Sequence, residues 1–238
     1  MTRKPADTYS PLYFLAALGA GGLSVTFFMY LMFWVPHPGR PVPIFEDIFA
    51  AFTNGPAALQ AGIVIAVIGI AAMTFLNVKY LLWNYSALAR FQKTEAYKAL
   101  RNSNGETTLL AAPLATAMTV NALFIVGLVF VPGLWTIIEY LFPLALVAFG
   151  VLGVWALRLI GDFLGRVLSE GGVFDVTSHN SFAQLLPAFA LAMIGVGFSA
   201  PAAMSLMPAT VAISLVISTF FAIAALVYTV VALITAFG

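Results

Sequence analysis

The chain has 238 residues, of which 62% are hydrophobic and only 8% charged, and its mean hydropathy is +1.03. These values exclude an ordinary soluble domain. The absence of cysteine excludes disulfides and thiolate metal sites, and a net charge of +1 gives no reason to expect a nucleic-acid partner. We therefore predict an all-α polytopic membrane protein that forms one transmembrane domain over residues 1–238.

The first apolar run, residues 11–35, is long enough to cross a bilayer and is rich in glycine around Gly19, where we expect the helix to break. Residues 36–43 contain four prolines and must form a loop. The spacing of apolar residues over 44–52 predicts a short interfacial helix. A second span follows over residues 57–83, and an amphipathic surface helix is expected over residues 84–101.

The third span, residues 108–131, differs from a plain membrane anchor because its first half carries Pro113, Thr116, Thr119 and Asn121. A helix interrupted by proline is tolerated in a membrane where protein or a watery cavity satisfies the freed backbone groups. We therefore expect this span to be an inner helix with the other helices arranged around it.

Three further spans are predicted over residues 134–167, 182–204 and 207–237, with a polar loop over 169–181. Glu139 follows closely after the turn at residues 132–133, so we interpret it as an interfacial carboxylate on the outer side. The alternative is a proton relay within the membrane.

The odd-numbered spans resemble one another. Each begins with polar residues, continues through a leucine and alanine run broken by Gly or Pro, and then carries Ser, Thr or Asn followed by Phe. The breaks fall at Gly19, Pro113 and Pro187, whereas the even spans lack this polar thread. About six helices in three hairpins, each with a kinked inner and a plain outer helix, are therefore predicted. Chance similarity between low-complexity apolar segments is the alternative.

The distribution of basic residues predicts the orientation. Nine of the ten Lys and Arg residues lie at the N-terminus or around the second and fourth loops, and Arg40 alone lies on the other side. The positive-inside rule then predicts a multi-pass protein of a bacterial-type inner (plasma) membrane with both termini in the cytoplasm.

Residues suited to catalysis or metal binding are scarce. Both histidines, His37 and His179, fall in predicted loops, which argues against axial haem ligands within the helices and against a buried Ser-His pair. We expect no enzyme activity, no catalytic residue, no metal and no cofactor.

Polar residues of the inner helices are the candidates to line a transport path. These pore-lining candidates are Ser24, Thr116, Thr119, Asn121 and Ser199. Hydrogen bonding between helices is the alternative role for them. Phe28, Phe124 and Phe198 are candidates for a gate that excludes water, with core packing as the alternative. A path with such a lining, without a buried acid or base, favours a small anion or a neutral solute.

Two short motifs resemble those of a known family: YFLAALG over residues 13–19, and LAAPL over residues 110–114 with Asn121. Together with the alternation of inner and outer helices, they resemble the tellurite-resistance and dicarboxylate transporter family, which includes the plant slow anion channels. The resemblance implies five hairpins around a central pore, a trimer with one pore per subunit, and an anion channel or exporter. This chain supplies three hairpins, and the pore-plugging phenylalanine of the fifth inner helix in that family has no counterpart here.

The sequence thus predicts a membrane channel or exporter for small anions, with membrane lipids and small anions as partners, no nucleic acid, and homo-oligomers that the resemblance implies are trimers. One alternative is a non-conducting membrane subunit that binds a partner through its basic cytoplasmic loop, which contains Arg90, Lys93, Lys98 and Arg101. Another is a carrier with alternating access.

Overall fold

The computed structural model describes residues 6–169 and 182–237, and within them it is an all-α polytopic membrane protein, as predicted. Six helical segments are long and apolar enough to cross a membrane: Pro11–Trp34, Ala57–Phe91, Asn104–Phe130, Leu134–Leu168, Phe182–Met204 and Pro208–Ile234. Their α-helical parts are α1 (Phe14–Trp34), α3 (Ala57–Phe91), α5 (Ala111–Phe130), α6 (Leu134–Ser169), α7 (Leu186–Met204) and α8 (Pro208–Phe237).

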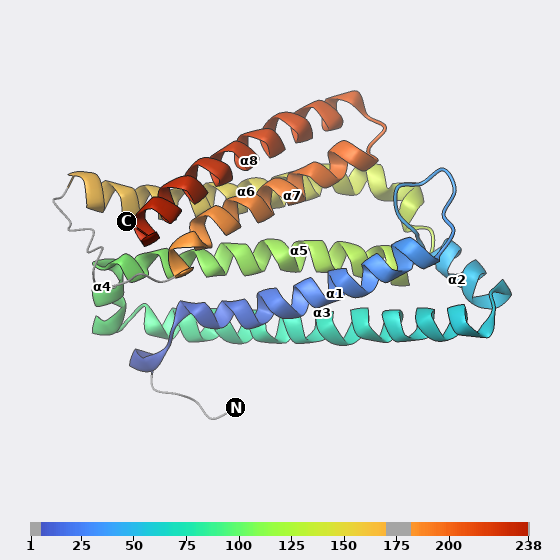
Figure 1. Ribbon diagram of the computed structural model, residues 1–238, viewed down its shortest axis with the longest axis horizontal. Coiled ribbons are helices and arrows are strands. Elements are labelled where there is room, and N and C mark those ends of the chain that lie inside the picture. The colour runs from blue at the N-terminus through green and yellow to red at the C-terminus, as the bar shows by residue number, and fades with distance from the viewer. Residues whose placement is uncertain (1–5, 170–181, 238) are drawn as a thin grey trace.

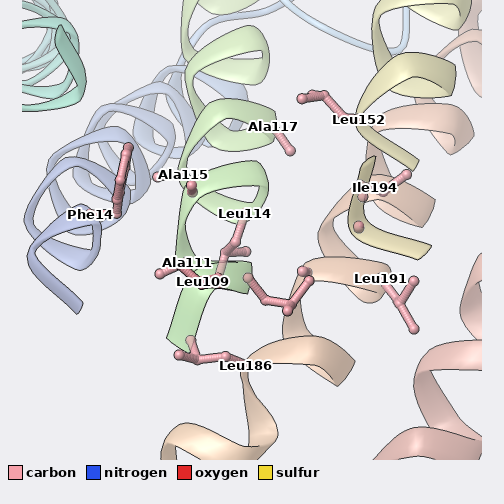
Figure 2. Close-up of a cluster of buried hydrophobic side chains, with 14 of the residues drawn as sticks. Phe14, Leu109, Ala111, Leu114, Ala115, Ala117, Leu152, Leu186, Leu191 and Ile194 are labelled. Carbon is pink, nitrogen blue, oxygen red and sulfur yellow. The ribbon is translucent and has the colours of Figure 1, made fainter. Parts of the chain in front are cut away.

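Helix α5 lies at the centre of the bundle and packs against α1, α3, α6 and α7 (Figure 1). In its most apolar stretch 61% of the residues are buried, and in that of α7 56%, whereas the corresponding shares for α3, α6 and α8 are 33%, 28% and 28%. The prediction of buried inner helices is therefore confirmed for α5 and α7, whereas α1, with 39% of its most apolar stretch buried, is buried little more than the outer helix α3. Figure 2 shows apolar side chains of α1, α5, α6 and α7 meeting around α5.

The three inner helices form a row and not a ring. Helix α5 contacts α1 on one side and α7 on the other, and in the described part of the chain α1 and α7 share no packed interface. The second and third inner helices also contact the outer helix of the hairpin before them, since α5 packs on α3 and α7 packs on α6. The repeat seen in the sequence is thus a repeat in packing as well.

Each inner helix begins with a short 3-10 helix: η2 (Pro11–Tyr13), η3 (Asn104–Leu110) and η4 (Phe182–Leu185). Pro113 and Pro187 lie within the first turn of α5 and α7, so the predicted breaks are helix starts. The physical reason is that a proline in the first turn loses an N–H that has no helical partner anyway. The prolines inside helices are Pro143 in α6 and Pro201 in α7.

The predicted break at Gly19 is also wrong, because α1 continues through it without interruption. A Cβ at Gly19 would meet nothing within 4 Å. The close approach occurs instead at Gly21, where a Cβ would lie 2.5 Å from Met118 Cγ and 2.8 Å from Asn77 Nδ2. Gly21 therefore lets α1 pack tightly against both α3 and α5.

The expectation that the even spans lack polar residues fails for α3, which faces α1 with three of them. The Thr74 hydroxyl lies 2.8 Å from Ser24 Oγ, and Asn77 Nδ2 donates to the Ala17 carbonyl at 2.7 Å. Asn84 Nδ2 donates to the Tyr13 carbonyl at 3.1 Å. Asn77 follows Thr74 by three residues and Asn84 follows Asn77 by seven, about two helical turns, so all three lie along one helix face. Hydrogen bonds between helices thus join α1 and α3 within the membrane.

The basic segment 84–101 is not one surface helix. Helix α3 runs on to Phe91, and the separate helix α4 (Glu95–Arg101) follows. Leu88 and Phe91 are buried, and Phe91 lies 5.5 Å from the ring of Tyr9. The Tyr9 hydroxyl donates to Asn84 Oδ1 at 2.9 Å, and burial raises the pKa of Tyr9, so that this donor keeps its proton. The predicted loop over 169–181 lies almost wholly outside the described residues, as does His179.

At the opposite end of the bundle, two carboxylates hold the connections between helices. The predicted interfacial helix is α2 (Phe45–Asn54), and its Glu46 Oε1 accepts the Gly133 N–H at 2.7 Å. Glu139 accepts the Ser205 hydroxyl at 2.7 Å and the Leu206 N–H at 2.6 Å. Glu139 thus fixes the turn between α7 and α8, which agrees with an interfacial position.

Candidate solute site

A cavity of about 50 Å³ lies between α5, α6 and α7. Its lining includes Asn121 and Phe124, which the sequence singled out as pore-lining and gate candidates. The other lining residues are Val120, Phe142, Ala145, Phe149, Gly197, Ala200 and Pro201. One water needs roughly 10–15 Å³ of such space, so this cavity can hold a small solute or several waters.

The polar groups of the cavity come from Asn121 and from the backbone of α7. Asn121 Nδ2 makes only a weak contact with Met193 Sδ, at 3.6 Å. Pro201 has no N–H, so the carbonyl of Gly197, four residues earlier, has no helical donor at that position. Asn121 and Gly197 therefore both line one partly open and almost wholly apolar space, and its lining contains no ionisable side chain.

Aromatic rings form much of the wall. Phe124 lies 6.5 Å from Phe142, and Phe149 lies 6.0 Å from Phe198, which is itself stacked on Phe221 at 5.7 Å. Phe198 is buried behind Phe149 and is not part of the lining. Of the three gate candidates, only Phe124 contacts the cavity directly; Phe28 is buried in the cluster of side chains at the α2 end.

The other pore-lining candidates have different partners. Ser24 bonds to Thr74, Thr116 lies 2.5 Å from the Tyr85 hydroxyl, and Thr119 donates to the Ala115 carbonyl at 2.9 Å. Hydrogen bonding within and between helices, the alternative role, therefore describes these three residues. Ser199 lies on the exposed surface in a groove between α7 and α8.

No family model, no curated protein and no solved structure matches this chain. The resemblance to the tellurite-resistance and dicarboxylate transporter family consequently rests on the sequence motifs alone. What the structure adds is the six-helix membrane fold and the cavity at Asn121.

Sequence reasoning missed a charged cluster at the α4 end of the bundle. The Glu106 side chain is only 3% exposed and lies 3.0 Å from Arg101 and 3.1 Å from Arg166. Arg101 also pairs with Asp162 at 3.1 Å, and Arg166 donates to the Ser103 carbonyl at 3.0 Å. The sequence feature that could have indicated this cluster is an acidic residue, Glu106, at the polar start of an inner span, with the basic residues Arg101 before it and Arg166 after it in the chain.

This cluster changes the interpretation of the basic loop. Arg101 is bound within the fold, and Lys98 pairs with Glu95 at 2.8 Å. Arg90 donates a hydrogen bond to the Ser86 hydroxyl. Neither Arg90 nor Lys93 forms an ion pair with a carboxylate in the described residues. Of the four basic residues of this loop, Arg101 alone is held by a buried carboxylate, and the Lys98–Glu95 pair lies on the exposed surface.

Proposed function

We propose that this protein carries small anions across a bacterial-type inner membrane, with the cavity at Asn121 as its solute site. The observation that supports the proposal is the cavity itself, a small and largely apolar space between three membrane-spanning helices, with Asn121 and its weakly bonded amide in the lining. An amide N–H binds an anion without a full positive charge, and aromatic walls exclude bulk water from it. The multi-pass membrane fold is compatible with transport.

The proposed orientation places both ends of the chain in the cytoplasm. The described ends of the chain lie at the same end of the bundle as α4, which is the end with most of the basic residues (Figure 1). A fluorescent reporter that folds only in the cytoplasm, fused after Gly238, should therefore be bright. The same reporter inserted at Gly39, in the loop before α2, should be dark. The reverse pattern would show that the orientation is inverted.

Anion flux in proteoliposomes tests the site. We expect Asn121→Leu to reduce chloride or nitrate flux by about tenfold or more, because a hydrogen bond to a charged group is worth roughly 1.5–3 kcal/mol. Thr119→Val is the matched control: its hydroxyl already bonds to Ala115 in its own helix, so flux should stay near that of the wild type. Equal flux from Asn121→Leu and wild type would refute the site.

The same assay separates a channel from a carrier. Flux that rises linearly with anion concentration favours a channel, and flux that saturates favours alternating access. Asn121→Leu should affect both modes, since the solute contacts the same amide in either.

A further inference from the structure

The groove between α7 and α8 is the third copy of a packing site that is filled twice elsewhere in the chain. Helix α5 packs on α1 and α3, and α7 packs on α5 and α6, so each of these two inner helices lies on the inner and outer helices of the hairpin before it. The last hairpin, α7 with α8, offers the same kind of surface. There the structure has an open groove of about 400 Å³.

The groove is suited to a closely packed helix. It is lined mainly by small side chains, and two hydroxyl residues lie on α8 in addition to Ser199 on α7. The lining residues are Ala192, Gly195, Val196, Ser199, Ser218, Thr219, Ala222 and Ala225. Small residues at helix spacing allow the backbones of two helices to approach closely. The Ser199 and Ser218 hydroxyls donate to the Val196 and Leu215 carbonyls of their own helices, so the small side chains are what suits the groove to a helix.

Helix α1 has an unpartnered face with matching properties. No inner helix precedes α1, and the side of it that points away from α5 carries Gly19, Gly22 and Thr26. A Cβ at either glycine would meet nothing within 4 Å, and Thr26 is exposed. Helices α1 and α8 lie on opposite sides of α5 (Figure 1), so the two surfaces cannot meet within one chain.

We propose that α1 of a second copy occupies the α7–α8 groove, so that copies associate head to tail in the same membrane orientation. The surfaces on the two copies differ, which makes the interface heterologous and allows a closed ring. Each copy would then extend the row of inner helices of its neighbour by one helix. The proposal concerns assembly and does not depend on which solute is carried.

Disulfide crosslinking tests the proposal, because the natural chain contains no cysteine. One tagged copy carries Thr26→Cys and a second, with a different tag, carries Ser199→Cys; a second pair uses Gly22→Cys with Ala192→Cys. Oxidation in membranes should give a crosslinked dimer containing both tags. In the control pair Ser199→Cys is replaced by Ile223→Cys, on the exposed face of α8 outside the groove, and crosslinking should fall at least several-fold.

Failure of both groove pairs to crosslink, or equal crosslinking of the control pair, would overturn the proposal. A dimer formed by Ser199→Cys with itself in preference to Thr26→Cys would show a symmetric contact and would also overturn it. As an independent measurement, Gly22→Leu should shift the purified protein to a smaller assembly in light scattering. This variant has room to fold, since nothing lies within 4 Å of a Cβ at Gly22; an unchanged mass would count against the interface.

Discussion

Replacing Glu106 by Gln is expected to destabilise the protein more than any other single charge change described above. The side chain is 3% exposed and is the shared partner of Arg101 and Arg166, so the substitution leaves two arginines without their common counter-charge. Breaking a buried ion pair by removing one partner typically costs about 3–5 kcal/mol. The temperature at which half of the detergent-purified protein stays monodisperse should fall clearly.

The control for this prediction is Glu95→Gln. Glu95 also pairs with a basic residue, Lys98, but their side chains are 87% and 69% exposed. Exposed pairs contribute about 0–1 kcal/mol, so the midpoint temperature should hardly change. Equal midpoints for Glu106→Gln and the wild type would show that the cluster at the α4 end does not hold the fold together.

The second large effect is expected from one added methyl group, in Gly197→Ala. A Cβ at this position would lie 2.1 Å from Phe149 Cε1, so the ring must move, and both residues line the solute cavity. Overpacking of this kind costs about 1–3 kcal/mol, and displacement of the ring should also lower anion flux. Midpoint temperature and flux are the two measurements.

Gly150→Ala in α6 gives the matched comparison. A Cβ there would meet nothing within 4 Å, and alanine is favoured over glycine in a helix by about 0.5–1 kcal/mol. This variant should therefore be as stable as the wild type or slightly more so, with normal flux. If the two alanine variants behave alike, the close packing of Gly197 on Phe149 is not what shapes the cavity.

Hydropathy and length located all six membrane helices because burial in lipid depends on composition over some twenty residues, a property that is local in sequence. The high burial of α5 and α7 could also be predicted, since polar residues in the membrane require partners inside the bundle. Helix α3 was misjudged because Thr74, Asn77 and Asn84 are few among the 35 residues of the helix, and they share one face only once the segment is helical.

The candidate site could be predicted only in part. Asn121 and Phe124 were recognised from their own span, but Gly197 and Phe149 enter the cavity from other helices, and no local pattern shows which helices meet. Pro113 and Pro187 were predicted to break their helices because the sequence does not reveal whether the α-helix starts before or at the proline. The 3-10 helices before α5 and α7 decide this, and they depend on tertiary packing at the bundle end.

The 3-10 geometry of η3 has a mechanical consequence. A 3-10 helix rises about 2.0 Å and turns about 120° per residue, compared with about 1.5 Å and 100° in an α-helix. If the seven residues Asn104–Leu110 rewound into α-helical form, the segment would shorten by about 3.5 Å and α5 would rotate by about 140° relative to its start. Such a screw motion would carry Asn121 out of its cavity, and it would have to break the ion pairs that join Glu106, which lies within η3, to Arg101 and Arg166.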